Sequence, residues 1–346
     1  MSFLTDEEID SLAINRMIFH VVGKGLQTPI YLKEISPPLY PDFFLERIKT
    51  SLKGNLFEFL DFSNVERILR IISNTADQNP NCFSDESKQL ATDFHSHHTG
   101  NASKGVFLLF ELTTILGKLY ALIKYENEDV VRYVLEDDVE VAHVPKLERF
   151  SESFVKKADA IQKVALVRFN EKSGGQVIVL DRSNRSHISD YFEKFLLVKR
   201  VNTETDLTKK LIAVLKKVFK ENAAILPDVI KREGINRIYS HLKSAEFEFN
   251  TSEPSVSLSV IFGNLTEDSP ILTSFNKEAK SHGILGESFI IRPENITSPK
   301  RRKIVTEENV IIIFDDNIEP TKTPLADGRT EIKIITAGIT LDDFEP

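Results

Sequence analysis

The chain has 346 residues, of which 41% are apolar and 28% charged, and its formal net charge is −8. This length and composition are typical of a soluble globular protein with two or three domains. The single cysteine, Cys82, excludes an intrachain disulfide and a cysteine-based zinc cluster. The acidic start MSFLTDEEIDSL lacks the apolar stretch of a signal peptide, and the longest apolar runs, such as Val310–Phe314, are too short to cross a bilayer. We therefore expect a cytoplasmic protein without a membrane segment.

Charge is distributed unevenly along the sequence. Residues 1–141 carry 13 Lys and Arg against 22 Asp and Glu, residues 142–240 carry 20 against 12, and residues 241–346 carry 11 against 18. A basic segment thus lies between two acidic ones. Because salt screens exposed charges beyond roughly 8 Å, a basic face can act locally on an acidic protein. A solvated helix face with no ligand would have the same composition.

The first acidic segment has patterns typical of both strands and helices. Residues 12–35 predict two strands around the turn at Gly23–Gly25. Apolar residues at helical spacing predict three helices, which contain Phe43–Leu52, Val65–Ile72 and Ser84–Phe94.

A series of strands is predicted from residue 104 onward. Residues 104–125 predict a β-hairpin that turns at Thr114–Lys118. Further strands are predicted at Val130–Leu135, Lys163–Phe169 and Gln176–Leu180.

The densest set of metal-ligating residue types is DFHSHH, at residues 93–98. Asp93, His95, His97 and His98 lack the spacing of a helical zinc pair such as HExxH, so a polar loop that leaves a helix is the better interpretation. The acids at 137, 138 and 140 are likewise interpreted as a solvated loop rather than a cation site.

The basic segment predicts a strand followed by amphipathic helices. Ser186 or Ser189 can cap a short helix, and Thr203 with Asp206 resembles a capping box for a long one. The apolar residues of the long helix fall within an arc of about 160° at 100° per residue. The opposite arc contains five lysines: Lys209, Lys210, Lys216, Lys217 and Lys220. Another helix is expected after Pro227.

The last hundred residues predict short strands separated by proline-containing loops. These strands are expected at Phe289–Arg292, Lys303–Thr306, Val310–Phe314 and Glu331–Ile335, while 247–259 is expected to be a linker or a strand edge. The predicted fold class is therefore α+β, with mixed sheets covered by helices and a smaller β-rich C-terminal lobe. The predicted domains are 1–141 (acidic α+β), 142–244 (basic) and 245–346 (β-rich).

Three blocks of the sequence together resemble the bacterial nucleoid-associated proteins of the NdpA type. They are Ile14-Asn15 followed by His20, the runs VFLLF and LYALIKY within 106–125, and DYFEKFLLVKRVNTETDLTKKLIAVL at 190–215. The resemblance covers most of the chain and is clearest before about residue 245. It implies a cytoplasmic protein located at the nucleoid that binds double-stranded DNA as a homodimer. It supplies no catalytic residues and no cofactor.

Phosphate neutralisation by Lys and Arg gives this implied DNA binding a physical basis, and such binding is independent of base sequence. The helix N-termini could add N–H donors to phosphate. The candidate DNA-binding residues are Arg182, Arg185, Lys199, Arg200, Lys209, Lys210, Lys216, Lys217 and Lys220. The run Lys300–Lys303 is a second basic stretch, interpreted as a solvated loop.

Two alternatives remain open from the sequence. Asp315 and Asp316 after one strand, with Glu331 and Lys333 on a paired strand, would resemble a Mg²⁺-dependent nuclease. Alternatively, acidic lobes that mimic DNA could bind a protein such as a DNA-processing enzyme. The chain contains no GxxxxGK[ST], GxGxxG or GxSxG motif, so nucleotide-dependent and serine-hydrolase chemistry lack a signature.

Overall fold

The computed structural model describes residues 3–75, 78–97, 104–126, 128–134, 146–153, 161–170, 174–315, 318 and 320–338. The chain forms two compact units, Met1–Asn295 and Ile296–Pro346. The three-part division of the sequence at 141 and 244 rests on charge and stays a prediction.

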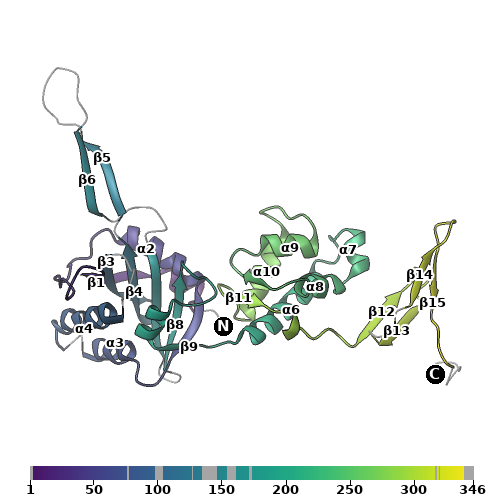
Figure 1. The fold of residues 1–346 in the computed structure, drawn as a ribbon, viewed down its shortest axis with the longest axis horizontal. Coiled ribbons are helices and arrows are strands. Elements are labelled where there is room, and N and C mark those ends of the chain that lie inside the picture. Colours follow the sequence, from purple (N-terminus) through teal and green to yellow (C-terminus); the bar gives the residue numbers. More distant parts are fainter. Residues whose placement is uncertain are drawn as a thin grey trace, which may run out of the picture. The chain divides into compact units, whose positions relative to one another are not determined.

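A seven-stranded sheet is the centre of the first unit (Figure 1). All of its neighbouring strands are antiparallel. In spatial order they are β1 (Ala13–Val22), β3 (Gly105–Thr114), β4 (Gly117–Glu126), β7 (Ile161–Asn170), β8 (Gly174–Asp181), β2 (Asn55–Phe59) and β9 (Val198–Arg200). The predicted hairpin at 104–125 is confirmed, with Thr114 paired to Gly117 at its turn. The predicted α+β class is also confirmed, and this sheet is antiparallel rather than mixed.

Both faces of the sheet are buried, which explains the uninterrupted apolar run of β3. Successive side chains of a strand point to opposite faces. Phe107 and Leu109 belong to one core cluster, and Val106, Leu108 and Phe110 belong to the other. An antiparallel sheet with one solvated face would alternate apolar and polar residues instead.

Helices cover each face of the sheet. One face packs against α3 (Asn64–Thr75), α4 (Cys82–His97) and α5 (Asp190–Leu196), and the other packs against α1 (Asp6–Asp10), α2 (Pro41–Thr50) and the 3-10 helix η1 (Ser51–Lys53). The ring of Phe94 stacks on Phe107 at 5.0 Å and meets Phe195 edge-on at 5.1 Å. Phenylalanine thus supplies much of this core, in keeping with its abundance in the sequence.

A helical region follows the sheet within the first unit. It contains α6 (Glu204–Glu221), α7 (Asp228–Glu233), α8 (Asn236–Leu242), α9 (Ser255–Phe262), α10 (Pro270–Ser281) and the 3-10 helix η3 (Pro293–Asn295). Its two short strands, β10 (Phe247–Asn250) and β11 (Ser288–Ile291), pair with each other. Helices α9 and α10 were not predicted. The α9 sequence SVSLSVIF is rich in β-branched and alternating residues that favour a strand. Pro270 at the first turn of α10, after the cap Ser269, is a helix-start signal that the sequence contains.

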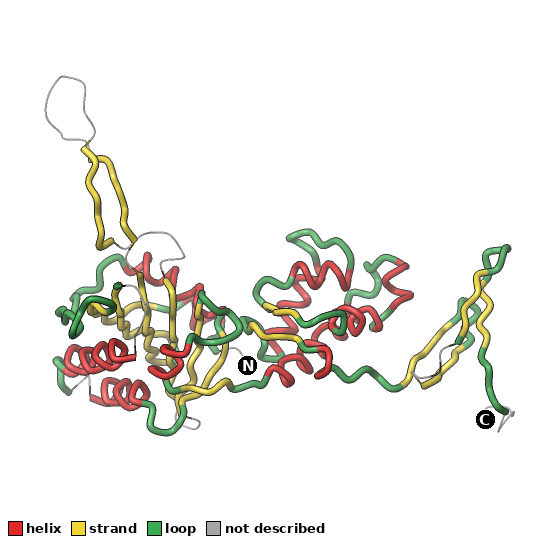
Figure 2. Tube along the Cα trace, viewed as in Figure 1, coloured by secondary structure: helices red, strands yellow, loops and turns green. Residues whose placement is uncertain are grey.

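The second unit, Ile296–Pro346, is β-rich, and Figure 2 shows its two hairpins as paired strands. Its strands are β12 (Arg301–Val305), β13 (Ile311–Asp315), β14 (Thr321–Pro324) and β15 (Thr330–Lys333). They form two separate two-stranded sheets, β12–β13 and β14–β15. The lobe expected from residue 245 also includes helices α9 and α10 of the first unit.

Two further local predictions differ in detail from the structure. Strand β5 (Glu128–Val134) was predicted, and its partner β6 (Lys146–Ser153) was not. The second strand expected within 12–35 is reduced to isolated bridges, which pair Ile30 with Val21 and Ile35 with Met17.

Candidate nucleic-acid interface

Helix α6 presents one buried face and one basic face, as its periodicity predicts. Thr203 caps the helix by accepting a hydrogen bond from the backbone N–H of Asp206 at 3.1 Å. The fully buried side chains of the helix are Leu207, Leu211, Val214, Leu215 and Val218. This face packs against α10, β11 and α8. Burial of this apolar face fixes the direction in which the lysines point.

Two of the five lysines are engaged with other parts of the fold. The Lys210 ammonium donates to the Asn202 side-chain oxygen at 2.6 Å. The Lys217 ammonium lies 2.6 Å from a carboxylate oxygen of Glu278, a side chain that is only 1% exposed. The hydrogen bond to Glu278 raises the pKa of Lys217, and the same bond lowers the pKa of Glu278. Lys217 therefore joins α6 to α10.

The other three lysines form what we call the outer lysine stripe: Lys209, Lys216 and Lys220. At 100° per residue they fall within an arc of about 40°. The Lys216 ammonium lies over the Tyr239 ring, 5.1 Å from its centre. Lys209 and Lys220 are exposed, and neither has a hydrogen bond or ion pair with the residues that the structure describes. The stripe therefore presents three ammonium groups on one side of a rigid helix.

The basic side chains around the turn after β8 have acidic neighbours. Arg185 pairs with Glu253 at 2.8 Å, and Lys199 on β9 pairs with Glu58 on β2 at 3.0 Å. Both pairs are exposed, so solvent screens them and each contributes about 0–1 kcal/mol. Arg182 lines a small cavity together with Arg185. These side chains can exchange their partners for a phosphate at low energetic cost.

Arg200 lies mostly inside the fold. Its side chain is 16% exposed and pairs with Glu287 at 2.8 Å. It also donates to the Ser288 carbonyl oxygen at 2.6 Å and to the Asn55 side-chain oxygen at 3.0 Å. Burial raises the pKa of Glu287, although Arg200 acts to lower it. Arg200 thus joins the large sheet to β11, and a contact with DNA stays a prediction for this residue.

The sequence did not predict a buried network beside this turn. The Lys163 ammonium donates to Asp181 at 2.6 Å, to Ser189 at 2.8 Å and to Ser183 at 2.9 Å. Burial would raise the pKa of Asp181, but the hydrogen bonds from Lys163 and the two serines lower it below its usual value. Lys163 and Asp181 face each other across the β7–β8 ladder. Lys163 and Asp181 are equally distant in sequence from residue 172, so a hairpin centred there would place them opposite each other. This spacing is the sequence signal that could have identified the pair.

Both helix N-termini near the basic residues are occupied by acidic side chains. Asp181 accepts from the backbone N–H of Ser189, the residue before α5, at 2.8 Å. The first turn of α6 contains Glu204 and Asp206. Their negative charge opposes an approaching phosphate, so the expected phosphate contacts at helix N-termini are corrected.

The residues of the nuclease alternative do not come together on paired strands. Asp315 lies on β13 and pairs with Arg301 at 3.6 Å, whereas Glu331 and Lys333 lie on β15, which pairs with β14. Asp316 is outside the described residues. The nuclease reading required the Asp strand and the Glu-x-Lys strand to be neighbours, and they belong to different sheets.

The histidine-rich segment is helical up to His97 rather than a loop from Asp93. His97 lies 3.4 Å from Asp93, and the backbone N–H of Gly23 donates to His95 at 3.3 Å. His98 lies outside the described residues. Within the described part of the chain, no group of three or more His, Cys, Asp and Glu side chains is arranged to hold a metal ion.

Fold and surface together define an α+β protein in which helix α6 presents a basic face opposite its buried apolar face. Comparison with models of protein families matches residues 18–339 to the family described as nucleoid-associated protein YejK. The chain therefore belongs to this family of nucleoid-associated proteins, as the resemblance predicted. A comparison with curated proteins gave no match. Among the described helices, none is both long and apolar enough to cross a membrane.

Proposed function

We propose that this protein binds double-stranded DNA through the phosphate backbone, with the outer lysine stripe as the principal contact. The observation that carries this proposal is the division of the α6 lysines into two that hydrogen-bond or ion-pair with the described residues and three that do not, of which Lys209 and Lys220 are exposed. Lysines without acidic partners are free to replace the counterions of DNA. Membership in a nucleoid-associated family supports DNA as the polyanion.

The contact is expected to be independent of base sequence. Each lysine is a flexible point charge, which suits phosphate better than the patterned edges of bases. Arg185 and Lys199 are proposed as secondary contacts, because each would first leave an exposed carboxylate. A non-enzymatic role, a homodimer, a location at the nucleoid in the cytoplasm and contact with DNA-processing enzymes are part of the same proposal and rest on the family.

Charge reversal on the stripe tests the proposal. The variant Lys209→Glu/Lys220→Glu should weaken binding to a duplex of mixed sequence by about tenfold or more at about 100 mM salt, because phosphate contacts dominate such affinities. Both side chains are exposed and lack structural contacts, so the variant should fold normally. Fluorescence anisotropy with a labelled duplex measures the dissociation constant.

The matched control is Lys24→Glu/Lys33→Glu, which makes the same charge change at two exposed lysines beside β1. We expect the control to retain most of the affinity. Equal losses in the two variants would show that net charge alone matters and would contradict the placement of the site on α6. Unchanged affinity in the α6 variant would also contradict it.

A further inference from the structure

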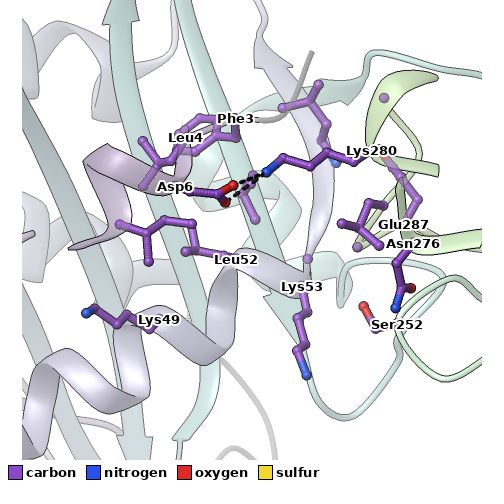
Figure 3. Close-up of a pocket in the computed structure, with 17 residues that line it drawn as sticks. Phe3, Leu4, Asp6, Lys49, Leu52, Lys53, Ser252, Asn276, Lys280 and Glu287 are labelled. Carbon is purple, nitrogen blue, oxygen red and sulfur yellow. Dashed lines mark hydrogen bonds and ion pairs between the residues drawn. The ribbon is translucent and has the colours of Figure 1, made fainter. Parts of the chain in front are cut away.

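A cavity of about 490 Å³ lies within the first unit, between α1, η1 and the segment that joins α10 to β11 (Figure 3). Most of its wall is apolar, formed by Phe3, Leu4, Ile9, Leu52, Leu56 and Leu285. This volume is within the range of about 300–1,000 Å³ that is typical of small-molecule sites. An apolar wall of this kind gains free energy when an apolar group replaces water.

The charges around this cavity do not cancel. Lys280 reaches across from α10 to Asp6 on α1, with both carboxylate oxygens within 2.8 Å, as Figure 3 shows. Glu287 is turned toward Arg200 and is paired there. Lys49 and Lys53, which also line the cavity, have no hydrogen bond or ion pair with the described residues. The rim is therefore net positive once the internal pairs are set aside.

A second cavity, of about 350 Å³, lies beside the first, and the two share Lys53 and Ser252 in their walls. The second is lined by Arg182 and Arg185 in addition to Lys53, with Glu253 as its acidic member. The two cavities therefore adjoin at Lys53, and we call them together the groove: the first has mostly apolar walls, and the second is lined by cationic side chains. None of the outer-stripe lysines lines either cavity.

We propose that this groove binds a small, elongated organic anion. Its apolar body would occupy the first cavity, and its phosphate or carboxylate group would lie against Lys53, Arg182 and Arg185. Guanidinium groups suit such oxyanions because their donors form a planar fork. The exposed Arg185–Glu253 and Lys280–Asp6 pairs are weak enough to open for a ligand. An acyl carboxylate has an apolar body with one anionic end, whereas a nucleotide carries a polar base and ribose and several phosphate charges.

Isothermal calorimetry on the full-length protein tests the proposal with three probes: decanoate, GTP and inorganic phosphate. We expect decanoate to bind with a dissociation constant below about 1 mM and at least about tenfold more tightly than phosphate. Decanoate should also bind more tightly than GTP, because only decanoate offers an apolar body to the first cavity. Tighter binding of GTP would show that charge alone selects the ligand and would contradict the proposal.

Two variants locate the binding. Lys53→Glu reverses the charge at the junction of the cavities and should weaken the organic anion at least about tenfold, whereas the control Lys33→Glu should not. Leu285→Trp fills the apolar end from its half-exposed rim and should weaken the same ligand without a change of charge. The proposal is overturned if decanoate does not bind, if phosphate or GTP binds equally well, or if Lys53→Glu leaves the affinity unchanged.

Discussion

The basic segment 142–240 contains two groups of cationic side chains with different roles. One group lies within the fold, and the other lies on the outside of α6. Lys163 is buried and Arg200 partly buried, and each holds several partners. Lys209 and Lys220 are exposed and hold no described partner. Burial therefore decides which cations stabilise the fold and which can meet a ligand. A count of charges in the sequence cannot separate the two groups.

Substitution of the two groups of cations should therefore have different effects on the stability of the fold. Removal of one member of a buried ion pair leaves an uncompensated charge in the interior and costs about 3–5 kcal/mol. Removal of an exposed lysine changes stability little, within about 0.5 kcal/mol. The inner cations should therefore affect folding and the outer ones should affect binding. Each variant below tests one side of this contrast.

The largest effect is expected for Lys163→Met. It leaves Asp181 buried without its ammonium partner, and we expect a loss of about 3–5 kcal/mol in the free energy of unfolding, measured by urea denaturation. The matched variant Lys163→Met/Asp181→Leu removes both charges and should recover much of the loss. A loss below about 1 kcal/mol in the single variant would show that the pair is not buried in solution.

Arg200→Ala should lower the free energy of unfolding by about 2–4 kcal/mol at neutral pH, because it leaves the Glu287 carboxylate without its cationic partner. Burial already raises the pKa of Glu287, and loss of Arg200 should raise it further. When a carboxyl has a higher pKa in the folded state than in the unfolded state, the fold loses stability as pH rises from the unfolded-state pKa through the folded-state pKa. The cost of the substitution should therefore be larger at pH 8 than at pH 5. Equal costs at the two pH values would contradict this role for Glu287.

His20 is a buried basic group that stays neutral. Its Nδ1 accepts the Leu32 backbone N–H at 3.1 Å, and its other nitrogen lies 3.0 Å from the Ser87 hydroxyl. Burial, with a contribution from Lys88, lowers its pKa to about 4. Because the unfolded chain takes up a proton first, stability should fall by about 2–3 kcal/mol as pH drops from about 6.5 to 4. The urea midpoint of His20→Gln should depend less on pH over this range than that of the wild-type protein. Equal dependence in the two proteins would contradict the assignment of this pH effect to His20.

The smallest effect on stability is expected for Lys209→Gln/Lys220→Gln. Both side chains are exposed, so the free energy of unfolding should change by less than about 0.5 kcal/mol. Thermal unfolding followed by circular dichroism measures the change. A loss above about 1 kcal/mol would show that the stripe has a structural partner and would weaken its assignment to ligand binding.

Periodicity predicted the parts of the fold that depend on local pattern. The apolar arc of α6 and the hairpin of β3 and β4 both follow from residue spacing, and both are present in the structure. Helix α9 was missed because tertiary packing overrides the strand propensity of SVSLSVIF. Helical spacing also predicted that the α6 lysines share one side of the helix, but it could not show that Lys217 pairs with Glu278.

The site depends on partners that are distant in the sequence. Arg200 and Glu287 are 87 residues apart, and Arg185 and Glu253 are 68 residues apart. No spacing rule connects such positions, so the sequence could not distinguish Arg200, which is internal, from Lys209, which is not. The nuclease hypothesis, which needed Asp315 and Glu331 on paired strands, was wrong on this point. The β propensity of the second unit does not predict which of its strands pair.

The salt dependence of DNA binding tests the central claim most directly. Each phosphate contact contributes about −0.9 to the slope of log K against log salt concentration on duplex DNA. If Lys209 and Lys220 contact phosphates, Lys209→Gln/Lys220→Gln should make the slope less negative by about 1.8, and Lys24→Gln/Lys33→Gln should leave it unchanged. Equal slopes for the wild-type protein and the α6 variant would contradict DNA binding by the outer lysine stripe.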